Sequence, residues 1–192
     1  MDIFPRKTNK HYQIFRCLLA FALLGGLLVA SASAMKSEWG ELFAGQFFTV
    51  RVPADTFPSF APPSDHQQSI LFDKKRGPGG PWVEFYRRVW PPGFTTAQKD
   101  QFVREGQMNR PRDQFTSGVV RVQVGQLFGY QCVWHDSQGR STLSTQLAGQ
   151  EYYLISAMCP SQEFGRWRAL FQAVIHSFRP SQGRPAGAVK QA

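Results

Sequence analysis

The stretch SQEFGRWRALFQAVIHSF, residues 161–178, carries the most regular pattern in the chain. Its large apolar residues recur at intervals of three and four, and this spacing predicts one apolar stripe along an α-helix. Ser161 is suited to cap the helix, Glu163 complements its positive end, and Pro180 follows its close. The stripe consists of Phe164, Trp167, Leu170, Phe171, Val174, Ile175 and Phe178. We expect this stripe to pack on the face of a sheet.

The segments before this helix have the pattern of an antiparallel meander. Strand-forming residues, several of them alternating apolar with polar, occupy four stretches that short turns separate. These connections are too short for crossover helices, which favours antiparallel pairing of neighbours. The four predicted strands are 119–124, 129–135, 141–147 and 151–158.

Three more strands are expected nearer the N-terminus. The first, 46–52, alternates, and a proline-bearing loop over 54–68 follows it. Strands 69–75 and 82–90 then form a hairpin around the basic, glycine-rich turn 74–81.

One further helix completes the expected elements. Residues 95–109 are rich in straight-chain side chains, begin at Thr95 and stop before Pro111, which predicts a polar surface helix. Together the elements predict an α+β fold, with a central antiparallel sheet of about six to seven strands flanked by helices. The C-terminal amphipathic helix is expected to pack on this sheet.

The first 34 residues have the pattern of a cleavable secretory signal peptide. A basic segment precedes the uncharged apolar run 17–30, and Ala32 and Ala34 offer an A-x-A site for cleavage before Met35. The alternative is an uncleaved anchor in the inner membrane. Because about 14 apolar residues are fewer than the roughly 20 that span a bilayer, cleavage and a periplasmic or secreted protein are favoured.

The chain is therefore expected to divide into a signal peptide (1–34), a linker (35–45), one α+β domain (46–179) and a disordered tail (180–192). Cleavage leaves 158 residues, with 18 Lys and Arg against 12 Asp and Glu and a formal charge of +6. This charge suits an anionic envelope component or a peripheral membrane contact. The basic residues are too dispersed to predict nucleic-acid binding.

Two cysteines remain after cleavage, Cys132 and Cys159. An oxidising compartment would permit a disulfide between them. In a simple meander, however, a third strand would separate them by about twice the strand spacing of ~4.8 Å, beyond the ~7 Å limit for a disulfide. Two buried thiols are the other interpretation.

The sequence predicts no catalytic, metal or cofactor site. Cys132 and His135 could be a nucleophile and its base, but the alternation along a strand points them to opposite faces. The remaining metal-ligand candidates, His66 and His176, have no paired spacing with His135 or the cysteines.

A candidate contact surface lies instead on the predicted strand 82–90. Alternate residues of this strand share one face, which mixes aromatic and charged side chains and is expected to be partly exposed. The predicted partner surface consists of Trp82, Glu84, Tyr86, Arg88 and Trp90.

The order of elements resembles the PsbP-like superfamily, which includes PsbP itself, Mog-type factors and DcrB-type exported domains. The residues that carry the resemblance are Phe47–Pro53 (FFTVRVP), Tyr152–Ala157 (YYLISA) and Phe171–Arg179, which ends in IHSFR. The resemblance implies a central antiparallel sheet flanked by helices and a non-enzymatic, partner-binding role. It carries over no functional residue.

These observations favour an exported, non-enzymatic accessory domain that binds a protein or a cell-envelope component. The alternative is a small secreted, hydrolase-like enzyme whose site is assembled only by folding, for instance around Cys132 or His135.

Overall fold

In the computed structural model, the described residues are 41–54, 56–58, 64, 66–73, 75–109, 114 and 117–181. They fall within one compact unit, Gly40–Ala192. The expected signal peptide lies outside the described residues, as do the first part of the expected linker and the expected tail beyond Ser181.

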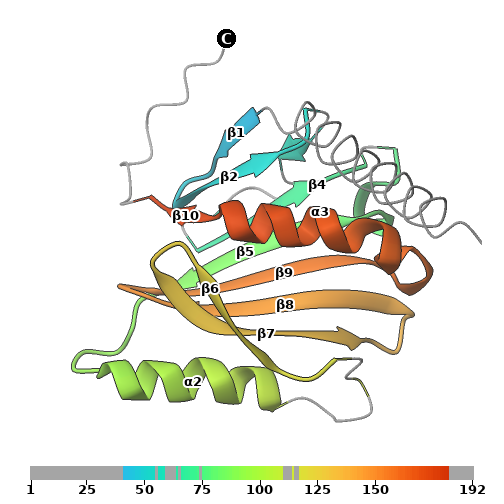
Figure 1. The fold of residues 1–192 in the computed structure, drawn as a ribbon. Coiled ribbons are helices and arrows are strands. Elements are labelled where there is room, and N and C mark those ends of the chain that lie inside the picture. The colour runs from blue at the N-terminus through green and yellow to red at the C-terminus, as the bar shows by residue number, and fades with distance from the viewer. Residues whose placement is uncertain are drawn as a thin grey trace, which may run out of the picture. The chain divides into compact units, whose positions relative to one another are not determined.

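An antiparallel sheet of seven described strands forms the centre of the domain (Figure 1), which confirms the expected sheet and meander. Its spatial order is β3-β4-β5-β9-β8-β7-β6. The bounds are β3 (Phe57–Pro58), β4 (Gln67–Leu71), β5 (Trp82–Arg88), β6 (Val120–Val124), β7 (Leu127–His135), β8 (Arg140–Ala148) and β9 (Tyr152–Pro160). Strand β3 lies within the expected loop, and β4 begins two residues before the expected strand and ends four residues before its end.

A smaller sheet has the order β1-β2-β10. Strand β2 (Phe48–Val52) was expected, whereas β1 (Glu41–Ala44) lies in the segment predicted as a linker and β10 (Arg179–Pro180) extends one residue into the predicted tail. Both additions pair through the backbone with β2, and the chain continues this pairing where Ser181 N donates to Phe47 O at 3.0 Å. Their side chains are mostly exposed and therefore leave no alternation in the sequence.

Among the described residues, two α-helices accompany the sheets, α2 (Thr96–Met108) and α3 (Phe164–Ser177). Helix α2 begins with a capping box, in which Thr95 Oγ1 accepts from Gln98 N and Gln98 Oε1 accepts from Thr95 N. Helix α3 follows a single 3₁₀ turn, η3 (Ser161–Glu163), so Ser161 is the first residue of that turn and does not cap the α-helix as expected.

The two helices contact opposite faces of the large sheet. Tyr153 of β9 packs edge-on against Phe178, just after α3, with ring centroids 5.2 Å apart. The next residue back, Tyr152, packs against Phe102 of α2 at 5.4 Å. Because adjacent strand residues point to opposite faces, α3 covers one face and α2 the other. The expected packing of α3 on the sheet is confirmed.

The core lies between α3 and the two sheets. Phe48 of β2 stacks on Phe85 of β5, with centroids 4.1 Å apart, and Phe178 stacks on both rings. The stripe of α3 contributes Phe171, Val174 and Ile175, which are fully buried together with these rings. Trp167 and the other N-terminal members of the stripe are half-buried.

Candidate functional site

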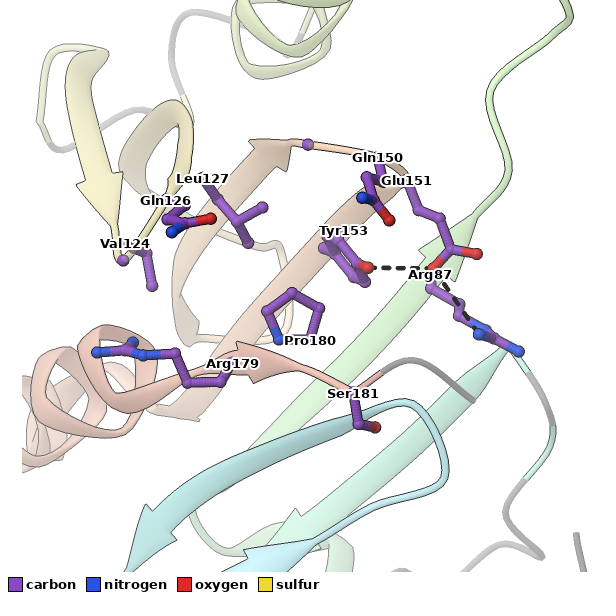
Figure 2. Close-up of a pocket in the computed structure, with 12 residues that line it drawn as sticks. Arg87, Val124, Gln126, Leu127, Gln150, Glu151, Tyr153, Arg179, Pro180 and Ser181 are labelled. Carbon is purple, nitrogen blue, oxygen red and sulfur yellow. Dashed lines mark hydrogen bonds and ion pairs between the residues drawn. The ribbon is translucent and has the colours of Figure 1, made fainter. Parts of the chain in front are cut away.

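A pocket of about 690 Å³ opens where the turns β6–β7 and β8–β9 meet the small strand β10 (Figure 2). We call this part of the molecule the turn end. Four segments line the pocket, namely the end of β5, the two turns, and β10 with the residue after it. The lining residues are Arg87, Val124, Gly125, Gln126, Leu127, Gly149, Gln150, Glu151, Tyr153, Arg179, Pro180 and Ser181.

The β6–β7 turn has two residues, Gly125 and Gln126, because Val124 pairs with Leu127. Gly125 has φ 60, a conformation that two-residue hairpins need and that L residues other than Asn and Asp rarely adopt. A Cβ atom added to Gly125 would lie 3.4 Å from Arg179 Cζ. Glycine therefore allows both the tight turn and the close approach of the Arg179 guanidinium.

One side of the pocket holds a carboxylate between a cation and a phenol. Arg87 Nη1 lies 3.7 Å from Glu151 Oε2, and the Tyr153 hydroxyl donates to the same oxygen at 3.0 Å. Burial, and then the negative charge of Glu151, raises the pKa of Tyr153 well above its ordinary value. Tyr153 is thus a neutral donor, and the charge of Glu151 is already shared with Arg87.

The opposite side of the pocket carries Arg179 (Figure 2). Its Nη1 donates to the carbonyl oxygens of His176 at 3.0 Å and Phe178 at 2.7 Å. No carboxylate of the described residues lies within 4.0 Å of this guanidinium. Arg179 therefore presents a positive charge that no acidic side chain in the described part of the chain neutralises.

Between the two arginines, the pocket has an apolar wall and polar rims. Val124, Leu127 and Tyr153 are buried, while Gln126 and Gln150 are exposed amides. Guanidinium and amide groups donate hydrogen bonds to carboxylates and phosphates. The arrangement is suited to bind a ligand that combines an anionic group with an apolar part.

Four residues of the predicted partner surface lie on strand β5. Register confirms that Trp82, Glu84, Tyr86 and Arg88 share one face of β5, and Glu84 accepts a hydrogen bond from the side chain of Gln67. Three of the four are half-buried, and Arg88 is exposed. Arg88 is therefore the most accessible of these four residues, and it lies at the turn end.

The prediction that Trp90 belongs to this surface was wrong. Strand β5 ends at Arg88, and Trp90 is only 8% exposed, in a cluster with Val103 of α2 and Tyr152. Its Nε1 donates to Gly149 O at 3.3 Å. The physical reason is that the chain leaves the sheet before Pro91, so the alternation no longer applies and α2 covers the ring.

The two cysteines do not form a disulfide with each other. Cys132 lies on the face that α2 covers, and its Sγ donates to Gln107 Oε1 at 3.1 Å. The same Gln107 amide donates to the carbonyls of Tyr130 and Ser144. Cys159 of β9 pairs with Ser141 of β8, whereas Cys132 of β7 pairs with Ser144, three residues further along β8. The two cysteines also point to opposite faces of the sheet. The intervening strand and the opposite faces explain why the disulfide is absent.

Cys132 and His135 also point to opposite faces, as their spacing predicted. His135 Nδ1 lies 2.6 Å from Ser141 Oγ, and Ser141 donates to Ser161 Oγ at 2.9 Å. The described residues contain no group of three or more His, Cys, Asp or Glu side chains that could hold a metal ion, so neither His66 nor His176 belongs to such a group there. None of the helices within the described ranges is long and apolar enough to span a membrane.

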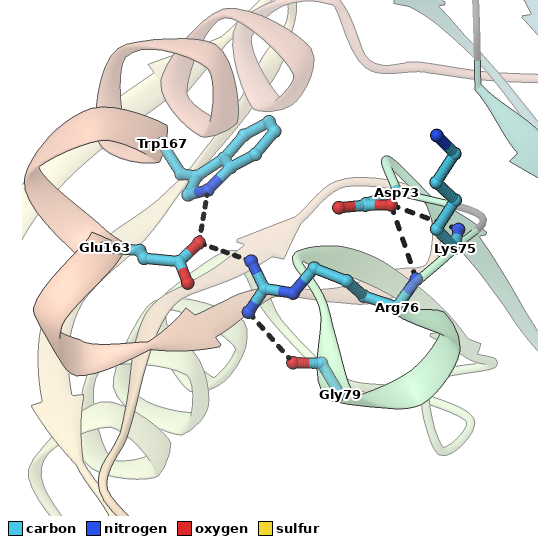
Figure 3. Close-up of polar contacts among 6 residues, drawn as sticks. All are labelled: Asp73, Lys75, Arg76, Gly79, Glu163 and Trp167. Atoms are coloured by element: carbon cyan, nitrogen blue, oxygen red, sulfur yellow. Dashed lines mark hydrogen bonds and ion pairs between the residues drawn. The ribbon is translucent and has the colours of Figure 1, made fainter.

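The basic, glycine-rich turn is held by an ion pair to the residue just before α3 (Figure 3). Arg76 Nη1 donates to Glu163 Oε2 at 2.7 Å, and Trp167 Nε1 donates to the same oxygen at 3.2 Å. Asp73 Oδ1 accepts from the backbone N of Lys75 and of Arg76 and so shapes the turn. These contacts fix the turn that joins β4 to β5 against the element that begins α3.

The pocket itself was not predicted from the sequence. Its residues come from four segments, and none of these segments carries a local motif for ligand binding. In the sequence, Arg179 stands out only within the segment Phe171–Arg179 that resembles a known family. A pairing of Arg179 with β2, which sets the position of its side chain, has no signal in the sequence.

The chain resembles known proteins in its structure. No protein-family model matches the chain, and no match was found among curated proteins. The solution structure of cyanobacterial PsbP (CyanoP) from Synechocystis sp. PCC 6803 matches with a TM-score of 0.51 and 8% identity, over 73% of this chain and 92% of that one. The domain has a PsbP-like fold.

A second solved structure agrees with this fold. It is the crystal structure of LpqN, involved in cell envelope biogenesis of Mycobacterium tuberculosis, with a TM-score of 0.50 and 14% identity, over 70% of this chain and 83% of that one. The fold that the sequence resemblance implied is thereby confirmed. At such identities the likeness concerns the PsbP-like fold alone.

Proposed function

We propose that this PsbP-like protein is an exported, non-enzymatic accessory domain that binds a protein or a cell-envelope component through its turn end. The observation that carries the proposal is the pocket at this end, where Arg179 presents a charge that no described carboxylate pairs. Two further observations support it. The first 34 residues have the pattern of a secretory signal peptide, and LpqN, which shares the fold, is involved in cell envelope biogenesis.

Binding fits the geometry better than catalysis does. Cys132 is buried under α2 and donates to Gln107, and His135 lies on the other face of the sheet. A nucleophile and its base must lie within hydrogen-bond reach of each other. The pocket, in contrast, gathers guanidinium, amide and phenol groups around an apolar wall, which are groups suited to holding a ligand.

The proposal is tested by crosslinking in the producing cell. A photoreactive residue replaces Gln150, which is exposed at the rim of the pocket, and in a matched variant it replaces Gln162, which is exposed in η3 at the other end of β9. We expect a discrete adduct, with a protein or a lipid, from position 150 and a much weaker one from position 162. Equal adducts from both positions, or none from position 150, would contradict the proposal.

A further inference from the structure

The loop between β5 and α2 lies at the turn end (Figure 1). It has the sequence VWPPGF, residues 89–94, and Val89 is 69% exposed. Phe102 of α2, which packs edge-on against Trp90, is 40% exposed. Two large apolar side chains next to one buried ring therefore reach solvent, Val89 as its neighbour in the chain and Phe102 as its packing partner.

This loop is held in place by its tryptophan. Trp90 donates to Gly149 O, stacks on Phe94 with centroids 5.7 Å apart, and packs edge-on against Tyr152 at 5.7 Å. Gly149 also lines the pocket, so the loop and the pocket share the β8–β9 turn. The loop and the pocket are thus joined by this turn and lie at the same end of the large sheet.

Positive charge dominates the turn end. Its described cations include Arg88, Lys99 and Arg179, beside Arg87, which lies 3.7 Å from the carboxylate of Glu151. Lys99 Nζ donates to Gly149 O at 3.2 Å, which places it beside the loop, and its neighbour Asp100 accepts instead from Tyr130. In the described part of the chain, Arg88, Lys99 and Arg179 form no ion pair with a carboxylate.

We propose that the turn end docks on an anionic phospholipid surface, an inference that rests on the proposed function and names its partner. The cations attract the anionic head groups, Arg179 binds a phosphate at the mouth of the pocket, and Val89 and Phe102 enter the interfacial region. Amphipathic surfaces of this kind bind membranes through a small apolar contact added to electrostatic attraction. Two exposed apolar side chains are, in contrast, a small patch beside the ~800 Å² per partner that a stable protein interface buries.

The electrostatic part is tested with the processed protein purified after export. We expect it to co-sediment with vesicles of phosphatidylcholine and phosphatidylglycerol, to bind phosphatidylcholine alone much less, and to detach as salt rises. Arg88→Glu should lower the partition coefficient roughly fivefold or more. The matched control is Arg168→Glu, which reverses an exposed arginine on α3 away from the turn end and should leave binding unchanged.

The apolar part has its own pair of variants. Val89→Ser should weaken binding to the anionic vesicles, while Val120→Ser, at an exposed valine in the edge strand β6 far from its turn, should not. Circular dichroism of each variant shows whether the fold is kept. We expect both variants to keep it, because both valines are exposed.

Three outcomes would overturn the inference. Anionic vesicles that bind no better than neutral ones would exclude a lipid surface, and binding that Arg88→Glu and Arg168→Glu weaken equally would exclude the turn end. Inorganic phosphate that binds at the pocket in calorimetry, without vesicle binding, would point to a free anion. If the Gln150 crosslink is nevertheless formed with a protein, the proposed function stands and only the lipid partner is wrong.

Discussion

Cys159 is a residue whose reactivity the fold lowers. It is fully buried on the face that α3 covers. Burial, and then the charge of Glu163, raises its pKa from the ordinary 9.0 to about 11. Near neutral pH the thiolate fraction is then lower by about a hundredfold, and the thiolate is the species that reacts.

We therefore predict that Cys159 resists alkylation in the native protein by at least about a hundredfold relative to the urea-unfolded protein. Peptide mapping by mass spectrometry measures this rate for each cysteine separately. Cys132, which is buried and donates to Gln107, should also be protected. Rapid labelling of Cys132 in the native state would revive the hydrolase alternative.

Glu163 should link stability to pH. The hydrogen bond from Arg76, and then the one from Trp167, lowers its pKa. A lowered carboxyl pKa contributes stability that is present above the ordinary pKa and is lost as pH falls through the lowered one. We predict that Glu163→Gln reduces the free energy of unfolding at neutral pH, and that the difference disappears in acid.

Urea titrations at the two pH values measure this difference. Glu41→Gln is the matched control, because Glu41 is exposed on β1, away from this contact. A Glu163→Gln effect of the same size at both pH values would show that the pair contributes through packing and not through charge.

At the scale of elements, we expect replacement of glycine by alanine to have opposite effects on stability at two positions. In Gly129→Ala, the new methyl group would collide with the backbone carbonyl of Gln146, so β7 and β8 must separate. We expect a loss of roughly 1–3 kcal/mol or more of unfolding free energy. In Gly165→Ala the methyl group meets nothing within 4 Å and favours α3, so we expect a gain of about 0.5 kcal/mol. Thermal or urea unfolding of both variants checks the two signs.

The elements also show what the sequence can and cannot predict. The helix α3 and the meander β6–β9 were predictable, because their apolar spacing is local and reflects a single buried face. Strands β1 and β10 were not, since they pair through their backbones while their side chains stay exposed. Trp90 was misplaced because alternation was extended past the point where β5 ends.

The candidate site could be predicted from the sequence less well than the helices and strands, because tertiary structure alone brings its residues together. Arg88 was predicted as part of a contact surface, and it does lie exposed at the turn end. Arg179 and Glu151 are 28 residues apart and line one pocket only because β10 pairs with β2 beside the end of β9. No pattern of spacing within the chain encodes such a meeting.

At the scale of the whole molecule, we propose that this domain works outside the cytoplasm, and that residues 1–34 direct its export and are then removed. The most direct measurement is the mass and N-terminal sequence of the protein in fractionated cells. We predict a chain that begins at Met35 in the periplasmic or secreted fraction. An intact chain that retains Met1 and is found in the cytosol would contradict it.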